Sequence, residues 1–219
     1  MIDGIRHIVW DWNGTLLDDT PACVQSLNRV LDRRGLPPVT CEQYRDIFGF
    51  PVQDYYRKLG MTFTPAEWDE LTREFHDYYA DYSRDTPLRE GIAETLAALR
   101  GRGMPMSVLS ASEIGILERM LGVRGIRGFF EHVCGLSNLD AHSKLDVGRE
   151  LTARLALPPE QVLLVGDTTH DYEVARDLKW PCVLLTGGHQ SEPRLRQCGC
   201  DVVSDPAEYL LGAVSAAAT

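Results

Sequence analysis

Residues 8–19 read IVWDWNGTLLDD, so a short apolar run leads directly into a turn rich in Asp and Asn. The β-branched and aromatic residues before Asp11 predict a buried strand. A carboxylate at the end of such a strand in a parallel sheet faces the edge where ligands bind. The stretch therefore predicts both the first strand of the fold and the first side chain of a functional site.

Four further β-branched or aromatic runs follow along the chain, and most are separated by helical patterns. These runs lie at residues 105–109, 129–134, 161–166 and 181–185. The helical patterns cover residues 90–102, 112–122, 143–156, 170–178 and 190–197. Near-continuous apolar strands that alternate with helices are typical of a parallel sheet covered on both faces. The sequence predicts an α/β fold with a Rossmann-like core.

Residues 18–88 interrupt this alternation, because they contain helical patterns and no convincing strand. The first helix is expected to begin with Thr20 as N-cap and Pro21 at N1, and to stop at Gly35. Further helices are expected over residues 41–48, 52–59 and 65–84. We therefore predict a core domain of residues 1–17 and 89–219, with an inserted all-helical cap domain of residues 18–88.

Composition excludes several classes of partner. The 219 residues carry a formal net charge of −10, which argues against a nucleic-acid surface. No apolar run reaches the length of a membrane span, and the first residues lack a signal-peptide pattern, so we expect a cytoplasmic protein. The six cysteines lack zinc-like spacing and are expected to be free thiols. A small molecule is the expected partner, and the sequence leaves monomer and homodimer open.

Polar side chains follow three of the predicted strands. Asp11 follows the first, Ser110 follows the run at 105–109, and Asp167 and Asp171 follow the run at 161–166. These ends meet at one edge of a parallel sheet, and Lys144, at the start of a helix, can reach the same edge. Clustered carboxylates need a cation, so we expect Mg²⁺ at Asp11, Asp167 and, with less support, Asp171.

Such a cluster suits phosphoryl transfer. A divalent metal and Lys144 neutralise a phosphoryl group, while Ser110 and backbone N–H groups after Asp11 orient its oxygens. Asp11 is then available as a carboxylate nucleophile that forms an aspartyl-phosphate. Each residue alone has a simpler explanation as a helix cap, a turn residue or a solvated lysine; the prediction depends on finding them together.

The segments DWNGTLLD, SVLSAS, SK and VGDTTHD resemble, in order and spacing, the four motifs of the haloacid-dehalogenase-like (HAD) hydrolase superfamily. The helical insertion after the first motif is similar to the C1-capped, phosphoglycolate-phosphatase-like branch. The resemblance implies that Asp11 is the nucleophile and that Lys144 stabilises the intermediate. It also implies that Thr15, Ser110 and the adjacent Ala111 bind the substrate, and that Asp11, Asp167 and the main-chain carbonyl of Asn13 hold Mg²⁺.

Asn13 departs from the family pattern, which usually has a second, proton-carrying Asp at this position. An amide does not exchange protons usefully near neutral pH, and loss of a general acid/base typically costs roughly 10² to 10⁴ in rate. Several explanations stay open: a substrate with a good leaving group, another proton donor, transfer to an acceptor other than water, loss of catalysis, or an Asp-to-Asn change made in the laboratory. His170 and His189, with His142 a weaker candidate, are the histidines that could replace the proton carrier, although a loop or capping role is the simpler interpretation.

We therefore predict a Mg²⁺-dependent phosphatase of a small phosphorylated metabolite, acting through Asp11. The alternatives are a catalytically weakened phospholigand-binding or regulatory protein, or a phosphotransferase. A dehalogenase and a phosphonatase fit less well, because Asp167 suits a metal and Lys58 is the only lysine of the cap. The cap is expected to select the substrate. The residues that could contact the leaving group lie near its helix breaks: Arg45, Tyr55, Tyr56, Arg57 and Lys58. The simpler interpretation of most of them is packing within the cap or exposure on a helix surface.

Overall fold

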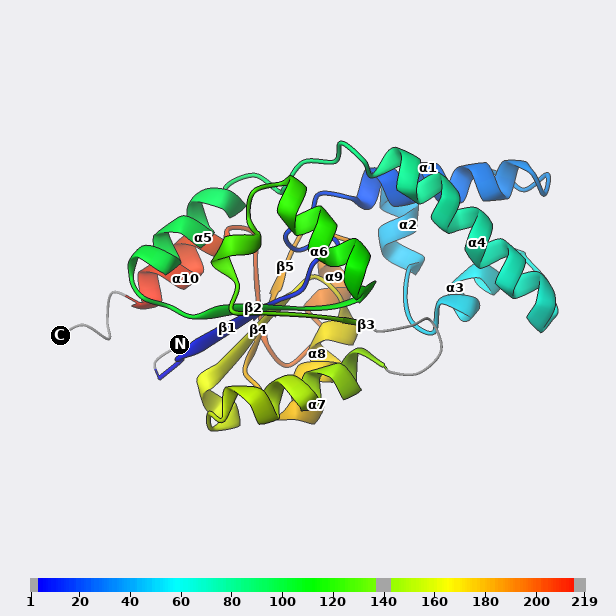
Figure 1. Ribbon diagram of the computed structural model, residues 1–219. Helices are drawn as coiled ribbons and strands as arrows, with labels where there is room; N and C mark the ends of the chain where they lie inside the picture. Colours follow the sequence, from blue (N-terminus) through cyan, green and yellow to red (C-terminus); the bar gives the residue numbers. More distant parts are fainter. Residues whose placement is uncertain (1–3, 137–142, 215–219) are drawn as a thin grey trace.

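A computed structural model describes residues 4–136 and 143–214, and within them one six-stranded parallel sheet forms the centre (Figure 1). The strand order is β3-β2-β1-β4-β5-β6. The strands are β1 His7–Trp10, β2 Met106–Glu113, β3 His132–Leu136, β4 Val162–Gly166, β5 Cys182–Leu185 and β6 Asp201–Val203. The predicted α/β, Rossmann-like class is confirmed, since all strand pairs are parallel.

Strand β1 shows why both faces of the sheet need a covering layer. Its side chains alternate between two apolar clusters: Ile8 and Trp10 belong to one and Val9 to the other. All three side chains are fully buried. A strand buried on both faces gives the continuous apolar run seen in the sequence.

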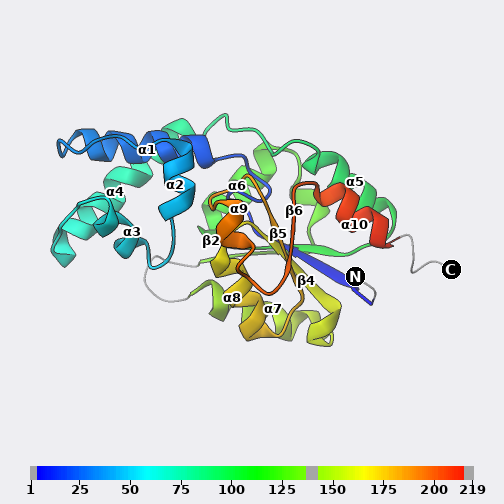
Figure 2. The ribbon, with the colours of Figure 1, turned by 180° about the vertical axis from the view of Figure 1, so that it is seen from behind.

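Helices fill both layers, as the two views in Figure 1 and Figure 2 show. One layer contains α5 Ile92–Gly101, α6 Ile114–Val123 and α10 Pro206–Val214; the other contains α7 Lys144–Leu155 and α8 Thr169–Leu178. Leu96 of α5 and Leu117 of α6 pack in the cluster of Ile8, whereas Leu151 of α7 and Val174 of α8 pack in that of Val9. Helix α9 Glu192–Leu195 and the 3-10 turns Arg127–Phe129 and Pro159–Gln161 are short connecting elements.

Four helices stand apart from the sheet, at the end of the molecule away from both termini (Figure 1). They are α1 Thr20–Asp32, α2 Cys41–Ile47, α3 Val52–Lys58 and α4 Pro65–Tyr82. Their apolar residues form a third cluster of their own, which includes Leu27, Tyr55 and Leu71. Leu17 and Leu88 form an isolated bridge where the chain enters and leaves this helical segment. The cap boundaries at residues 18 and 88 remain a prediction.

Three sequence expectations about local structure need correction. Helix α1 is capped by Asp19, so Thr20 is already its first residue and not the N-cap. Strand β2 continues to Glu113, with a shift of its register against β3 between Leu109 and Glu113, so Ser110 lies within the strand instead of after it. Strand β6 was not predicted, because it has only three residues and its first, Asp201, is exposed.

Two compositional expectations can also be compared with the structure. All six cysteines are free thiols, as expected. In the described part of the chain, no helix combines the length and apolarity that crossing a membrane requires.

Candidate active site

The site lies at the carboxyl ends of three neighbouring strands. Strand β1 pairs with β2 on one side and β4 on the other, so Asp11, Ser110 and Asp167 come to one edge of the sheet. Asp11 is 7% exposed, whereas Ser110 and Asp167 are completely or almost completely buried. The structure therefore brings together the three strand-end residues that the sequence analysis selected.

Lys144 reaches this edge from the first residue of α7. Its Nζ donates to Oδ1 of Asp11 and, at 2.5 Å, to Oδ1 of Asp171. The side chain is 5% exposed, and a lysine is rarely buried to this degree without a partner. Lys144 is thus a fixed cation between two carboxylates and not a solvated surface lysine.

Asp171 is held by the start of α8. Its Oδ2 accepts hydrogen bonds from the hydroxyl of Thr168 at 2.6 Å, the backbone N–H of Thr168 at 3.0 Å and that of Asp167 at 3.2 Å. Burial raises the pKa of Asp171, but the ion pair and hydrogen bonds with Lys144 and Thr168 outweigh it, so the net shift is downward. Asp171 is therefore an anchor for Lys144 with few unused lone pairs.

For the other two carboxyl groups, burial outweighs the effect of the neighbouring cations on the pKa. Burial raises the pKa of Asp11 to about 8; Asp171 and Asp167 act in the same direction and Lys144 opposes them. Burial also raises the pKa of Asp167 to about 6, despite the opposing effect of His189. Three carboxylates around one lysine leave net negative charge in a buried site, which favours a bound cation.

The donor set fits a hard divalent metal. Asp11, Asp167 and Asp171 each offer a carboxylate oxygen, and these oxygens lie within 4.8 Å of one another. Oxygen donors of this kind are those that Mg²⁺ binds. Because Asp171 is committed to Lys144 and Thr168, Asp11 and Asp167 are the better side-chain ligands.

Asn13 points its side chain away from this group and into a second hydrogen-bond network. Its Nδ2 donates to Oδ2 of Asp19 and to the hydroxyl of Tyr79, both at 2.8 Å, and its Oδ1 accepts from Ser112 Oγ at 3.0 Å. Tyr79 also donates to Asp19 Oδ2 at 2.7 Å, and the backbone N–H of Gly14 donates to Oδ1 at 2.7 Å. The amide at position 13 is thus fixed through both of its polar atoms.

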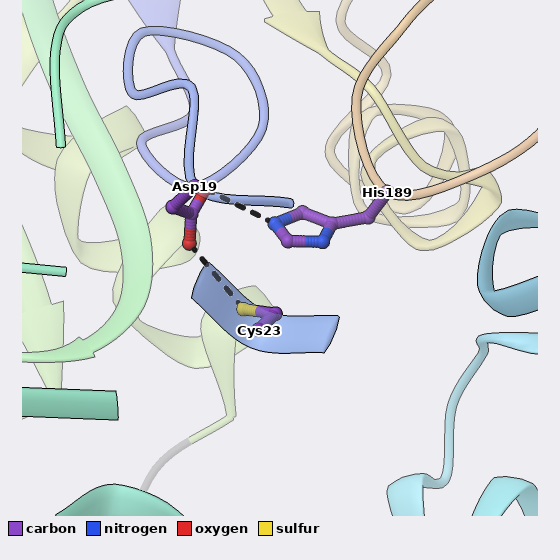
Figure 3. Close-up of side chains that lie close together, drawn as sticks. All are labelled: Asp19, Cys23 and His189. Carbon is purple, nitrogen blue, oxygen red and sulfur yellow. Dashed lines mark hydrogen bonds and ion pairs between the residues drawn. The ribbon is translucent and has the colours of Figure 1, made fainter. Parts of the chain in front are cut away.

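Asp19 contacts both His189 and Cys23, as the dashed lines in Figure 3 show. His189 Nε2 is 3.2 Å from Asp19 Oδ1, and Cys23 Sγ donates to Oδ2 at 3.6 Å. Burial raises the pKa of Asp19, but His189 and the hydrogen bonds outweigh burial, so the pKa falls to about 2. Burial lowers the pKa of His189, but Asp19 outweighs burial, so the pKa rises to about 9. Both oxygens of Asp19 already accept from two or more donors, so we assign this trio to an ion pair and hydrogen bonds rather than to a metal.

The histidines considered as replacement proton carriers differ in their surroundings. His189 has both ring nitrogens occupied, Nε2 by Asp19 and Nδ1 by the Tyr44 hydroxyl at 3.0 Å. His170 is half-buried, packs against Phe50 with ring centroids 4.6 Å apart, and lies 3.5 Å from Glu173. His142 lies outside the described residues. A proton-transfer role for any of them stays a prediction.

The residues expected to contact substrate occupy different positions. Ser110 and Ala111 line the cavity next to Asp11. Thr15 instead donates its hydroxyl to Asp167 Oδ1 at 3.0 Å and is fully buried. Thr15 therefore contacts Asp167, a candidate metal ligand. The expected contact between Thr15 and the phosphate of the substrate remains a prediction.

The cap residues singled out in the sequence separate into two groups. Tyr55 and Tyr56 are buried and line the cavity, whereas Arg57 and Lys58 are exposed and Arg57 pairs with Asp54. Arg45 reaches the loop after β5, where it donates to the carbonyls of Gly188 and Gly187 at 2.8 and 2.9 Å. Within the described residues, no Arg or Lys of the cap lines the cavity.

Several site residues escaped the sequence analysis. Asp19, Tyr79, Ser112 and Thr168 serve the networks described above, and Arg89 donates to the carbonyl of Gly14 at 2.8 Å. Asp19 and Ser112 lie only a few positions along the chain from predicted site residues, so their proximity in sequence could have indicated that they belong to the site. Tyr79 is 60 residues from Asp19 along the chain, so only the folded cap brings the two together.

The fold and the carboxylate–lysine cluster define a Rossmann-like α/β protein with its candidate site at the carboxyl ends of the central strands. The chain belongs to the haloacid dehalogenase-like hydrolase family, whose model matches residues 8–185. It is 28% identical over 212 residues to phosphoglycolate phosphatase of Synechococcus elongatus, covering 96% of this chain and 98% of that protein. It is also 30% identical over 173 residues to the tyrosine-protein kinase PtkA of Mycobacterium tuberculosis, covering 77% of this chain and 57% of the kinase.

Solved structures share the same fold. A haloacid dehalogenase-like family protein from Streptococcus pneumoniae superposes with a TM-score of 0.82 at 22% identity, covering 95% of this chain and 98% of that one. The Asp-to-Asn variant of CbbY from Rhodobacter sphaeroides, in complex with xylulose-(1,5)bisphosphate, gives a TM-score of 0.71 at 19% identity, covering 93% and 96%. The resemblance to the HAD superfamily and its phosphoglycolate-phosphatase-like branch is thereby confirmed, and so is the expectation of an enzyme of this hydrolase type.

Proposed function

We propose that the protein is a Mg²⁺-dependent phosphatase that hydrolyses a small phosphorylated metabolite through an aspartyl-phosphate on Asp11. One observation carries the proposal: at the end of β1, Lys144 binds Oδ1 of Asp11, with Asp167 beside it on the neighbouring strand end. This arrangement leaves Oδ2 of Asp11 for attack on phosphorus. The relatives that are phosphoglycolate phosphatases support the same class of substrate.

Asp11 and Lys144 perform the first chemical step. Asp11 Oδ2 bonds to phosphorus, the bond between phosphorus and the ester oxygen breaks, and the leaving group departs with the electron pair. Lys144 stabilises charge on the phosphoryl oxygens, and Ser110 and Ala111, which line the cavity, orient them. Mg²⁺, held by Asp11, Asp167 and the main-chain carbonyl of Asn13, would neutralise further phosphoryl charge.

The metal has a second role at Asp11. Burial raises the pKa of this carboxyl even though Lys144 opposes the shift, so Lys144 alone does not offset the cost of burying the ionised form. A protonated carboxyl is a poor nucleophile. A cation at the site favours the ionised form, so activity is expected to depend on the divalent metal.

Asn13 sets the limits of the reaction. It keeps its backbone in place through Asp19, Tyr79 and Ser112, but it supplies no proton to the leaving oxygen and takes none from water. The second step, attack of water on the aspartyl-phosphate, therefore proceeds without a base at this position. We expect this step to be slow and the phosphoenzyme to accumulate.

A phosphotransferase is the second candidate, and Asn13 together with the similarity to a protein named as a tyrosine kinase favours it. In that case an alcohol takes the place of water in the second step. A phospholigand-binding protein without turnover is the third. The intact contacts among Lys144, Asp11 and Asp171 argue against it, because binding alone does not need an aligned nucleophile.

Acetyl phosphate tests the proposal, since its leaving group needs no proton. We expect phosphate release that requires Mg²⁺ and disappears in Asp11→Asn, with a phosphoryl mass increase on the unmodified chain after rapid quenching. Asp18→Asn, an exposed aspartate of the same segment, is the matched control and should retain activity. Binding of phosphate and metal without turnover or mass increase would favour the binding protein, and turnover that rises with added alcohols would favour the phosphotransferase.

A further inference from the structure

We propose that the leaving group of the substrate is a neutral aromatic ring, so that the enzyme hydrolyses phosphate monoesters of phenols. This inference rests on the proposed function and specifies its substrate class. Two independent features lead to it: the lining of the cavity between the sheet edge and the cap, and the amide at position 13.

The cavity has a volume of about 340 Å³ and extends from Asp11 and Lys144 into the cap. Its size falls within the roughly 300–1,000 Å³ of small-molecule sites. The charged residues of its lining lie at the sheet edge, beside the place for the phosphoryl group. The far end is formed by α1 to α4.

The cap end of the cavity is aromatic. Its lining includes Phe48, Tyr55, Tyr56, Trp68 and Phe75. The first four of these rings contact one another in sequence: centroids are 5.4 Å apart for Phe48 and Tyr55, 5.3 Å for Tyr55 and Tyr56, and 5.4 Å for Tyr56 and Trp68. A planar ring can add to such a series by edge-to-face or offset contacts, each contributing beyond its buried area.

The cap supplies no positive charge to this lining. Among the described residues 20–82, the side chains that line the cavity include no Lys, Arg, Asp or Glu, and burial lowers the pKa of the one histidine, His76, which favours its neutral form. A leaving group with a carboxylate, such as glycolate, would have its charge buried against rings without a partner, at a high desolvation cost. A neutral, apolar leaving group avoids this cost.

Two polar atoms of the lining have no partner. The hydroxyl oxygens of Tyr55 and Thr72 are buried and make no hydrogen bond within the described structure, and both residues line the cavity. Buried hydroxyls usually have a hydrogen-bond partner. A neutral polar substituent on the ring, such as a hydroxyl, would give one of them a partner.

Asn13 leads independently to the same substrate class. When Asp11 attacks phosphorus and the P–O bond breaks, an alkyl alcohol leaves as a strongly basic alkoxide that needs a proton in the same step. A phenol leaves as a phenolate, keeps the electron pair, and takes its proton later from water. Water then attacks the aspartyl-phosphate, the bond between Asp11 and phosphorus breaks, and phosphate and the free carboxylate result. An aryl ester thus tolerates the missing acid.

The experiment compares esters that separate ring, size and leaving group. Initial rates are measured with Mg²⁺ for acetyl, phenyl, 2-naphthyl and cyclohexyl phosphate and for 2-phosphoglycolate. The second ring of 2-naphthyl phosphate is expected to lower KM about five- to tenfold relative to phenyl phosphate. Cyclohexyl phosphate has a similar size but an alkyl leaving group, and kcat/KM, which reports the step in which the leaving group departs, should be at least about 100-fold lower than for phenyl phosphate.

Each outcome has one meaning. A preference for 2-naphthyl and phenyl phosphate over the other two esters supports the inference. An equal or higher kcat/KM for 2-phosphoglycolate or cyclohexyl phosphate overturns it, while acetyl phosphate turnover shows that the phosphatase itself stands. Failure of acetyl phosphate as well refutes the proposed function, and this inference with it.

Variants of the cap test the location of the ring. Thr72→Phe fills the cavity and should lower the ratio of kcat/KM for 2-naphthyl over acetyl phosphate about tenfold, whereas exposed Arg73→Phe should leave the ratio unchanged. Tyr55→Phe, which keeps the ring, should remove any preference for 4-hydroxyphenyl over phenyl phosphate. An unaltered ratio in folded Thr72→Phe, judged by circular dichroism, places the ring elsewhere and contradicts the inference.

Discussion

Asn13 and Asp19 are joined by a 2.8 Å hydrogen bond in which the amide Nδ2 donates to the carboxylate Oδ2. Only a donor at position 13 can make this contact with an ionised Asp19. An aspartate there would place two carboxylates at the same distance, and one of them would have to hold a proton. The environment of position 13 is therefore matched to an amide.

Asn13→Asp is expected to convert this hydrogen bond into a pair of carboxyl groups that share a proton. The protonated partner can serve as general acid, so kcat/KM for cyclohexyl phosphate should rise by roughly 10² or more, with little change in kcat/KM for acetyl phosphate. Steady-state kinetics with both esters checks this. Unchanged rates for cyclohexyl phosphate would mean that the proton comes from another group.

The double variant Asn13→Asp/Asp19→Asn exchanges the amide and the carboxylate. It restores one donor and one acceptor across the 2.8 Å contact, so in a His189→Gln background, which lacks the ion pair with Asp19, it should be more stable than Asn13→Asp at neutral pH. Urea denaturation of both variants measures the difference, for which we expect about 1–2 kcal/mol. Equal stability would show that the two positions are not coupled.

Gly14→Ala should weaken metal binding. Gly14 has a φ of +71°, and a Cβ atom there would overlap the carboxylate of Asp167 and lie 2.6 Å from Cδ2 of His189. Gly35→Ala is the matched control, since its φ is +67° and its Cβ would meet nothing within 4 Å. Both variants carry the left-handed strain of about 1–2 kcal/mol, but only Gly14→Ala should raise the Mg²⁺ concentration needed for half-maximal activity. If both variants changed the Mg²⁺ concentration for half-maximal activity equally, Gly14 would have no specific role in metal binding.

Lys144→Met should abolish turnover and destabilise the fold, because it leaves Asp11 and Asp171 buried without their cation. Breaking a buried ion pair costs about 3–5 kcal/mol. Exposed Lys58→Met is the control and should change the free energy of unfolding little. Urea denaturation without divalent metal makes the comparison, and a stability equal to that of the control would contradict the ion-pair geometry.

Mg²⁺ should raise the thermal midpoint of the unmodified protein. Binding at about 100 times the dissociation constant adds about 2.7 kcal/mol to stability, or very roughly 5–10 °C for a chain of this length. Asp167→Asn should lose most of this shift, whereas Asp177→Asn, an exposed aspartate on α8, should keep it. Differential scanning fluorimetry with and without EDTA is sufficient. A full shift in Asp167→Asn would move the metal away from this residue.

The ion pair of His189 with Asp19 should make the free energy of unfolding decrease as the pH rises into the alkaline range. The pKa of His189 is raised from its ordinary 6.5 to about 9, so the folded state holds a proton that the unfolded state releases. The resulting stabilisation is complete below pH 6.5 and is lost as the pH rises through about 9. In EDTA, the free energy of unfolding of the native protein should decline across this window, and that of His189→Gln should decline less. A parallel decline in both would exclude the pair as the cause; His132→Gln, which keeps the pair, is the control.

The strands of the core were predictable because burial on both faces of a sheet leaves a pattern within each short segment of the sequence. A strand buried on both faces gives an unbroken apolar run, so the five longer strands, each of four or more residues, were found from their composition. The three-residue β6 has too few residues for such a pattern. The position of Asp19 as N-cap of α1 was missed since Thr20 and Pro21 fit a start one residue later.

The site was only partly predictable. Parallel strand ends must converge, so Asp11, Ser110 and Asp167 could be grouped before any coordinates. The partners of Asn13 could not be found in this way. Tyr79 and His189 reach Asp19 from a cap helix and from the loop after β5, and no periodicity of the sequence links those segments.

The bridge between Leu17 and Leu88 has an evolutionary consequence. The strand pairings of the sheet involve neither the helices of residues 20–82 nor the turns between them, and the chain departs and returns at adjacent points. Exchange of that whole segment for another of different length or shape would remove the contacts of Tyr79 and Tyr44, but it would leave the sheet and the contacts of Lys144 with Asp11 and Asp171 in place. New specificities can arise by grafting at this junction, while the carboxylate–lysine cluster is inherited unchanged.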